Sequence, residues 1–362
     1  MSIPFNNLKP ENEQIRSRAM RRINQLLDDS VFIEGKELAK FERNFAEYCG
    51  VKYCLGLASG TDALRTALLA CNVVAGDEVI TTPLTYTATS LAIAHAGARP
   101  VFVDIGKDGN INPQKISNAV TGRAKAILAV HMYGNPCDMD KIRKITQKHN
   151  LFLIDDCSHA QGATYKGKKI GSLADISCFS FYPTKNLGAW GDAGGITTNS
   201  RTLRDNAYLY KNCGEIKRNY SVVTGYNSKL DPVQAIVLDE KLKYLDRWNN
   251  NRRKVAAYYR KGLAGLPGIG LVPMIAGSSY YLFTILADNK DLLRKTLELS
   301  GIPTGEHYPQ PMHLQECFRN LGYKKGDFPV AEKFTERVIT LPFYPSLKPS
   351  AQQKITRAIK GL

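Results

Sequence analysis

Short apolar runs alternate with amphipathic stretches between about residues 50 and 200. Seven of these runs resemble strands, at residues 53–58, 78–82, 100–105, 126–130, 151–155, 176–181 and 195–198. Amphipathic stretches such as residues 61–71 and 139–149 lie between them and carry apolar residues at helical spacing. Strands and helices that alternate in this way predict an α/β domain with a mostly parallel sheet.

The pattern changes after residue 200. Residues 202–213 and 232–260 form long helical patterns, and the second is rich in leucine, lysine and arginine. The stretch 262–277 then interrupts the chain with five glycines and two prolines. Breaks of this kind separate elements and often lie near domain boundaries.

Beyond this break, residues 280–286 alternate like a strand, and residues 290–300 and 351–361 have helical patterns. This mixture predicts a smaller α+β domain that packs on the first. We therefore expect a large domain over residues 1–245 and a small C-terminal domain over residues 246–362.

The composition is that of an ordinary globular protein. The 362 residues are 43% hydrophobic and 23% charged, which excludes a disordered or fibrous chain and allows a substantial core. The first residues do not have the pattern of a signal peptide. The longest uncharged stretch, residues 79–98, contains Pro83 and several threonines and therefore suits a strand, a loop and a helix better than a membrane span.

Eight cysteines are scattered along the chain without a CxxC pair. This arrangement predicts reduced thiols in a cytoplasmic protein, and it offers no zinc-like cluster. We expect no metal site.

The net charge of +16 is the unusual figure, and it is unevenly distributed. Residues 1–200 carry 23 basic and 19 acidic side chains, whereas residues 201–362 carry 26 and 14. Such an excess fits an anionic ligand, a nucleic acid or an acidic surface, and does not choose among them. Because no nucleic-acid reader module is recognisable in the sequence, we expect no nucleic-acid partner.

Small residues connect the first predicted strand to the following helix, in the order Ala58-Ser59-Gly60-Thr61. The free N–H groups at a helix start, together with the Thr61 hydroxyl, form a suitable cradle for a phosphate group. The same residue types are also ordinary N-caps, so this motif alone is weak.

Two acids and a histidine follow another apolar strand, at Asp155, Asp156 and His159. Ligands of α/β proteins bind at the carboxyl ends of the strands, so this is a candidate site. One of the acids could simply cap the next helix, while the other could serve a buried cation.

Lys185 lies between an aromatic strand that contains Ser180 and a glycine-rich loop at residues 188–195. A lone lysine is usually a solvated surface residue, but one that is held inside a site can form a Schiff base with an aldehyde. The phosphate cradle, the acid at a strand end and the lysine together fit pyridoxal 5'-phosphate (PLP). This cofactor needs anchored phosphate oxygens, an acid beside its pyridine nitrogen and a lysine for its aldehyde. A carboxylate near that nitrogen favours the protonated, electron-withdrawing ring.

The chain resembles the DegT/DnrJ/EryC1/StrS family of sugar aminotransferases over nearly its whole length. The segments that carry the resemblance are SGTDAL (59–64), PLTYTATS (83–90), VHMYGNPCDMD (130–140), DDCSHAQGA (155–163), SFYPTKNLGAWGDAGG (180–195), GYNSKLDPVQA (225–235) and HYPQPMH (307–313). The resemblance implies the aspartate-aminotransferase fold (PLP fold type I). In that fold the large domain has a mostly parallel, mixed seven-stranded sheet, and a smaller α+β domain follows it.

The resemblance also implies roles for individual residues. Lys185 would be the Schiff-base lysine and later the proton shuttle, and Asp156 would pair with the pyridine nitrogen. The phosphate would be held by Gly60, Thr61 and Ser180.

Further roles follow from the same resemblance. Tyr86 would stack on the face of the cofactor ring. His159 stands where the family commonly has glutamine near the cofactor hydroxyl, and an imidazole there could change its charge with pH. Asn227 would reach the phosphate of the neighbouring subunit, which implies a homodimer with shared active sites. His307 and Tyr308 fall where the C-terminal segment approaches the sugar, although His307 could equally be a structural histidine.

The implied activity is the transfer of an amino group from L-glutamate to a nucleotide-linked keto sugar, with pyridoxamine phosphate as the intermediate form of the cofactor. The string FYPTKNLGAWGD is similar to the branch that acts on TDP-linked 3-keto-6-deoxyhexoses. This favours amination at C3, which gives a TDP-3-amino-3,6-dideoxy sugar. The alternative is a C4 aminotransferase that acts on a UDP- or TDP-4-keto sugar. A more remote alternative is a non-catalytic regulatory protein that has retained the fold.

Overall fold

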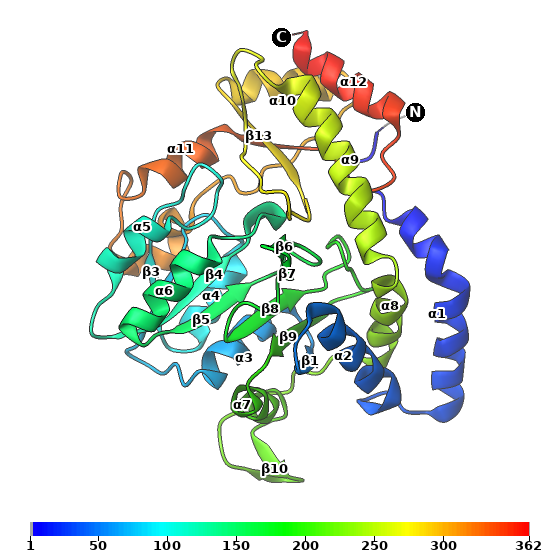
Figure 1. The fold of residues 1–362 in the computed structure, drawn as a ribbon, viewed down its shortest axis with the longest axis vertical. Helices are drawn as coiled ribbons and strands as arrows, with labels where there is room; N and C mark the ends of the chain where they lie inside the picture. The colour runs from blue at the N-terminus through cyan, green and yellow to red at the C-terminus, as the bar shows by residue number, and fades with distance from the viewer. Residues whose placement is uncertain (1–2, 362) are drawn as a thin grey trace.

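A seven-stranded sheet in the order β1-β9-β8-β5-β4-β2-β3 forms the centre of the protein (Figure 1). The computed structural model describes residues 3–361. The strands of this sheet are β1 (Tyr53–Leu57), β2 (Glu78–Thr81), β3 (Arg99–Phe102), β4 (Ala124–Val130), β5 (Phe152–Asp156), β8 (Ile176–Ser180) and β9 (Gly194–Thr198). Strand β9 pairs antiparallel with β1 and β8, and every other neighbouring pair is parallel. The predicted mostly parallel, mixed seven-stranded sheet is therefore confirmed.

Helices cover both faces of this sheet, which explains why its strands are apolar on both sides. Leu128 of β4 packs into one cluster with Leu64 of α3 (Gly60–Ala70), and this cluster also includes residues of α4 (Thr87–His95) and α7 (Arg201–Lys211). Its neighbour Ile127 packs on the opposite side with Ile142 of α6 (Met139–His149) and Ile116 of α5 (Pro113–Ile116). Successive residues of a strand point to opposite faces, so adjacent apolar residues fill two separate cores.

Two N-terminal helices and one later helix complete this part of the protein. Helix α2 (Gly35–Cys49) packs its phenylalanines against β8, and α1 (Lys9–Asp29) packs against α8 (Pro232–Leu242). The two-stranded pairs β6–β7 and β10–β11 and the short 3-10 helices lie outside the main sheet. Their bounds are β6 (Thr164–Tyr165), β7 (Lys168–Lys169), β10 (Glu215–Lys217), β11 (Tyr220–Ser221), η1 (Ser117–Ala119), η2 (Met132–Gly134), η3 (Met312–Leu314) and η4 (Glu316–Leu321).

The C-terminal part has its own antiparallel sheet, formed by β12 (Ile269–Leu271), β13 (Phe283–Ala287) and β14 (Val338–Leu341). A separate apolar cluster joins this sheet to α9 (Leu245–Leu263), α10 (Lys290–Leu299) and α12 (Pro349–Lys360). Helix α11 (Pro329–Arg337) leads directly into β14. Helices α10 and α12 and strand β13 lie at the top of Figure 1, and α9 runs from there down to α8. The boundary between residues 245 and 246 stays a prediction.

One predicted element differs from the structure. The continuous helical pattern over residues 232–260 forms two helices, α8 and α9, because the Tyr244 N–H donates to the Lys241 carbonyl at 2.9 Å in a tighter turn. All eight cysteines lie within the described residues and are free, as predicted. Among residues 3–361, no helix is long and apolar enough to cross a membrane.

The parallel strands bring distant segments to one edge of the main sheet. Strand β5 ends at Asp156, β8 ends at Ser180 and α3 begins at Gly60. Because the carboxyl ends of parallel strands and the following helix starts share one edge, these residues lie near one another. The candidate site is built at this edge.

Candidate active site

A cavity of about 450 Å³ lies at this edge of the sheet. Nine of the ten site residues predicted from the sequence line it, namely Gly60, Thr61, Tyr86, Asp156, His159, Ser180, Lys185, His307 and Tyr308. Its lining also includes side chains to which the sequence analysis assigned no role, namely Thr85, Thr89, Ser158, Tyr182, Thr184, Asp192 and Tyr281. The segments that carry these residues are far apart in the sequence, so the cavity is a product of the fold.

The start of α3 forms one wall of the cavity. Ser59 caps this helix, since its hydroxyl accepts a hydrogen bond of 3.1 Å from the Asp62 N–H. Among the hydrogen bonds of residues 3–361, none has the backbone N–H of Gly60 or of Thr61 as its donor. These donors and the positive end of the helix dipole suit a phosphate group.

Gly60 allows β8 to approach this helix start closely. A Cβ atom at position 60 would lie 2.6 Å from Ser180 Cβ, so only glycine leaves room for this contact. The approach brings the Ser180 hydroxyl to the helix N-terminus. Gly194 of β9 fits equally tightly, since a Cβ atom there would lie 2.1 Å from the Ser59 carbonyl oxygen. The residues at this wall therefore fit the phosphate of PLP.

Asp156 is buried, and both of its carboxyl oxygens accept hydrogen bonds. Thr89 Oγ1 donates to Oδ2 at 2.9 Å, and the Ser158 N–H donates to Oδ1 at 3.0 Å. The Thr89 hydroxyl also lies 2.7 Å from the Thr85 hydroxyl. These contacts fix the carboxyl group in the cavity wall, where it fits a protonated ring nitrogen.

Lys185 is the last residue of a turn, in which its N–H donates a hydrogen bond of 2.8 Å to the Tyr182 carbonyl. Its Nζ atom lies 4.3 Å from the centroid of the Tyr281 ring. Tyr281 precedes β13 and belongs to a segment that the sequence marks only as a strand, with no signal for chemistry. Its position at Lys185 is therefore a finding of the structure.

His159 has a defined tautomer. Its Nδ1 atom lies 3.3 Å from the Tyr133 N–H and can only accept there, which assigns the ring proton to Nε2. The Nε2 atom faces the cavity, 3.4 Å from the Tyr308 hydroxyl. Burial, and after it the charge of Lys185, holds the pKa of His159 well below its ordinary value. The imidazole is therefore a neutral donor at neutral pH.

His307 and Tyr308 bring the C-terminal part to the cavity. His307 Nδ1 lies 2.9 Å from Thr340 Oγ1, its ring stacks on Phe5, and burial followed by Lys185 lowers its pKa to about 4. The Tyr308 ring lies 5.9 Å from that of Tyr86, which is 60% exposed. His307 thus has structural partners and also lines the cavity.

Asn227 is the predicted site residue that does not line this cavity. It is exposed, forms an isolated β-bridge with Asn212, and accepts a hydrogen bond of 3.3 Å from Lys229. Its predicted role at the neighbouring subunit's phosphate stays a prediction, as do the roles of the nine residues that line the cavity.

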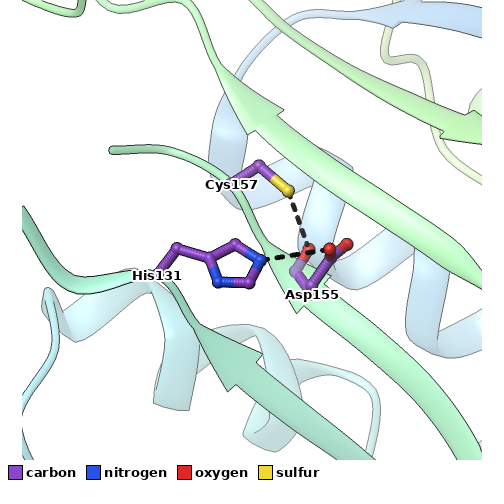
Figure 2. Close-up of side chains that lie close together, drawn as sticks. All are labelled: His131, Asp155 and Cys157. Carbon is purple, nitrogen blue, oxygen red and sulfur yellow. Dashed lines mark hydrogen bonds and ion pairs between the residues drawn. The ribbon is translucent and has the colours of Figure 1, made fainter. Parts of the chain in front are cut away.

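His131, Asp155 and Cys157 form a fully buried cluster next to Asp156 (Figure 2). His131 Nδ1 accepts from the Cys137 N–H at 3.1 Å, so Nε2 carries the proton and donates to Asp155 Oδ2 at 3.2 Å. Both ring nitrogens are therefore engaged, and His131 has no lone pair to offer a cation. Burial raises the pKa of the Cys157 thiol well above its ordinary value. Through this cluster His131, which follows β4, is hydrogen-bonded to Asp155 near the end of β5.

The family model of the DegT/DnrJ/EryC1/StrS aminotransferase family matches residues 13–360. The chain therefore belongs to this family, as the motifs predicted, and it is an aminotransferase.

Two curated relatives match along almost the entire chain. A "Pleiotropic regulatory protein" from Geobacillus stearothermophilus is 42% identical over 364 residues, which cover 99% of this chain and 98% of the relative. A "dTDP-3-amino-3,4,6-trideoxy-alpha-D-glucose transaminase" from Streptomyces venezuelae is 39% identical over 362 residues, which cover 99% of this chain and 95% of the relative.

Two solved structures have the same fold. DesV of S. venezuelae, in complex with a ketimine intermediate, superimposes with a TM-score of 0.97 at 38% identity and covers 99% of this chain and 98% of its own. The ntda protein of Bacillus subtilis, with bound cofactor PMP, gives a TM-score of 0.92 at 32% identity, with 99% of this chain and 84% of that chain covered. The predicted fold of the family is confirmed, and PLP and its amino form PMP are the cofactors of this family.

Proposed function

We propose that this protein transfers an amino group from L-glutamate to C3 of a TDP-linked 3-keto-6-deoxyhexose, with PLP as its cofactor. The observation that carries this proposal is the meeting of Lys185, Asp156 and the Gly60–Ser180 contact around one cavity. The similarity to a transaminase named for a dTDP-3-amino sugar supports the choice of C3 and of TDP.

When bound, PLP would supply an electron-withdrawing ring that stabilises negative charge on the carbon from which a proton is removed. Lys185 would take that proton and return it, as a single positioned general base and acid. The Asp156 carboxyl, fixed by Thr89 and Ser158, would keep the ring nitrogen protonated. The N–H groups of Gly60 and Thr61 and the Ser180 hydroxyl would hold the phosphate.

The remaining cavity residues would bind and orient. His159 would donate its Nε2 proton to the cofactor hydroxyl, and its charge would not vary near neutral pH because its pKa is lowered. Tyr86 would lie on the ring face, and His307 and Tyr308 would contact the sugar. Tyr86 lines the cavity and is 60% exposed, so the substrate would enter beside it.

The proposed active unit is a homodimer in which each site receives Asn227 from the neighbouring subunit. Large apolar side chains are exposed on the loop after α1 and on the β10–β11 hairpin, including Phe32 (51% exposed), Ile33 (58%) and Ile216 (64%). A second copy of the chain that covers such residues would remove apolar surface from water.

The proposal is tested with the purified protein loaded with PLP. Glutamate is expected to bleach the absorption band of the bound cofactor, and a panel of TDP- and UDP-linked 3- and 4-keto sugars is then added. Only TDP-3-keto sugars should restore the band, and the matched variant K185A should show neither change. Restoration by 4-keto sugars alone would refute amination at C3 and support the C4 alternative.

A regulatory role beside the aminotransferase activity is a second candidate, because the relative at 42% identity is named a regulatory protein. A protein with this additional role would bind DNA as well as respond to glutamate. Its binding to DNA at low protein concentration would depend strongly on salt, because phosphate contacts release counterions. A gel-shift titration at two salt concentrations, run beside the glutamate assay, separates the two functions.

A further inference from the structure

The ring of Tyr281 lies close to two nitrogen-bearing side chains that line the cavity. Lys185 Nζ is 4.3 Å from the ring centroid, and the His159 ring centroid is 4.5 Å away on a plane tilted by 39°. Lys185 belongs to the loop after β8, whereas Tyr281 comes from the segment before β13. The contact therefore joins the C-terminal part of the protein to the reacting lysine.

The position of the Tyr281 ring is fixed by contacts of its hydroxyl group and of its backbone. Its hydroxyl lies 3.1 Å from Thr184 Oγ1, on the residue that precedes Lys185. Its N–H donates to the Tyr133 carbonyl at 2.9 Å, and its own carbonyl accepts from Arg252 at 3.3 Å. Arg252 is buried, with 3% of its surface exposed. These anchors keep the ring at Lys185 without any contact to a bound ligand.

We propose that Tyr281 is a further residue of the reaction, whose ring receives the Lys185 ammonium group once this lysine, free of the cofactor, has taken up a proton. The face of an aromatic ring is electron-rich and attracts a cation within about 6 Å of its centroid. The ring thereby keeps the free lysine inside the cavity, where it returns the proton. This inference rests on the proposed function for the identity of Lys185 as the reacting lysine.

Other charged or titratable groups also line the cavity around Lys185, and the experiment must leave them unchanged. They are Asp156, His159, Asp192, His307, Tyr308, Tyr86 and Tyr182. Burial lowers the pKa of both histidines, so neither competes for the ring as a cation at neutral pH. Because the two acids also attract the ammonium group, only substitutions at position 281 isolate the contribution of the ring.

The test measures the rate at which a small acylating reagent labels Lys185 in the cofactor-free protein, by mass spectrometry across a range of pH. Only the neutral amine reacts, so a ring that stabilises the ammonium form slows labelling. Y281M keeps an apolar side chain and removes the ring, while the matched control Y281F keeps the ring. We expect Y281M to label about 2- to 30-fold faster than Y281F near neutral pH, from the strength of a cation–π contact.

A change in access to the lysine gives a different result. Wider access would raise the labelling rate by the same factor at every pH, including the high-pH plateau where the amine is wholly neutral. The ring effect disappears on that plateau. Equal rates for Y281M and Y281F at neutral pH, or one constant factor at all pH values, would overturn the proposal.

A second series guards against misfolding of Y281M. Phenylalanine analogues with increasing fluorination at position 281 keep the ring shape and progressively remove its negative face. Labelling of Lys185 near neutral pH should accelerate along this series, and a flat series would contradict the proposal. Because these readouts use cofactor-free protein, loss of the proposed transaminase activity would leave them interpretable, and their failure would leave that activity untouched.

Discussion

Thr89 Oγ1 donates a hydrogen bond of 2.9 Å to Asp156 Oδ2 and so joins the first turn of α4 to the end of β5. The Ser158 N–H holds the other carboxyl oxygen at 3.0 Å. A strand end alone leaves a carboxyl group free to rotate. The Thr89 hydroxyl, which comes from α4, sets the direction of the Asp156 carboxyl group in the cavity.

Removal of the Thr89 hydroxyl should weaken cofactor binding. T89V is expected to raise the Kd of PLP about 5- to 30-fold, because a buried acceptor that loses its donor costs about 1–2 kcal/mol. The matched variant T89S keeps the hydroxyl and should bind nearly as the unmodified protein does. Absorbance titration with PLP measures both, and equal Kd values for the two variants would show that Thr89 does not orient Asp156.

The contact between Gly60 and Ser180 gives a steric prediction. In G60A the new Cβ would lie 2.6 Å from Ser180 Cβ, so the start of α3 and β8 must move apart. We expect at least a tenfold loss of affinity for PLP and for inorganic phosphate as a competitor, because the phosphate donors would separate. G122A is the control, since a Cβ atom at that position meets nothing within 4 Å. Phosphate affinity retained in G60A would argue against a cradle at this wall.

The two cavity histidines predict how stability depends on pH. Burial lowers the pKa of His307 to about 4 and that of His159 well below its ordinary value, which is about 6.5 in an unfolded chain. At pH values between the lowered pKa of each folded histidine and about 6.5, the unfolded chain binds more protons than the folded protein. The free energy of unfolding should therefore be fully retained above about pH 6.5 and fall as the pH drops toward 4.

Urea unfolding of the cofactor-free protein at several pH values measures this slope. H307Q removes one of the two groups and should flatten the decrease between about pH 6.5 and 4. H95Q, at an exposed position of α4, is the matched control and should leave the slope unchanged. A slope in H307Q that equals that of the control would contradict a buried neutral His307.

Shared active sites predict complementation between inactive variants. K185A and N227A should each have little activity as homodimers, if Asn227 serves the partner's site. In a mixed dimer, one site would combine the intact Lys185 of one subunit with the intact Asn227 of the other. Unfolding and refolding a 1:1 mixture should recover about a quarter of the activity, the fraction of sites that random pairing restores in a symmetric dimer.

The result separates two arrangements of Asn227. If each site used Asn227 of its own chain, N227A subunits would contain no competent site, and K185A subunits would contain none either. Activity that stays at the level of the separate variants after mixing would therefore refute the shared site. A homodimer detected by light scattering would not decide this question alone.

Much of the fold and site could be predicted because the signals are local. The predicted apolar strands agree with the observed strands to within a few residues. Gly60, Asp156 and Ser180 lie at strand ends or a helix start that the pattern marks, and Lys185 lies in the loop after one of these strands. The prediction of one continuous helix over residues 232–260 is wrong, because a single tight turn at Tyr244 leaves the spacing of apolar residues almost unchanged.

The sequence by itself determined the alternation of strands and helices, the order of the three cofactor motifs and the membership of a family, since each depends on residues close together in the chain. Only the tertiary structure decided that Thr89 orients Asp156, that Tyr133 sets the tautomer of His159, and that Tyr281 lies at Lys185. The physical reason is that these contacts join segments far apart in sequence. These hydrogen bonds and the ring contact form only when the sheet brings such segments to one edge. The local spacing of apolar residues does not predict which distant segments come together there.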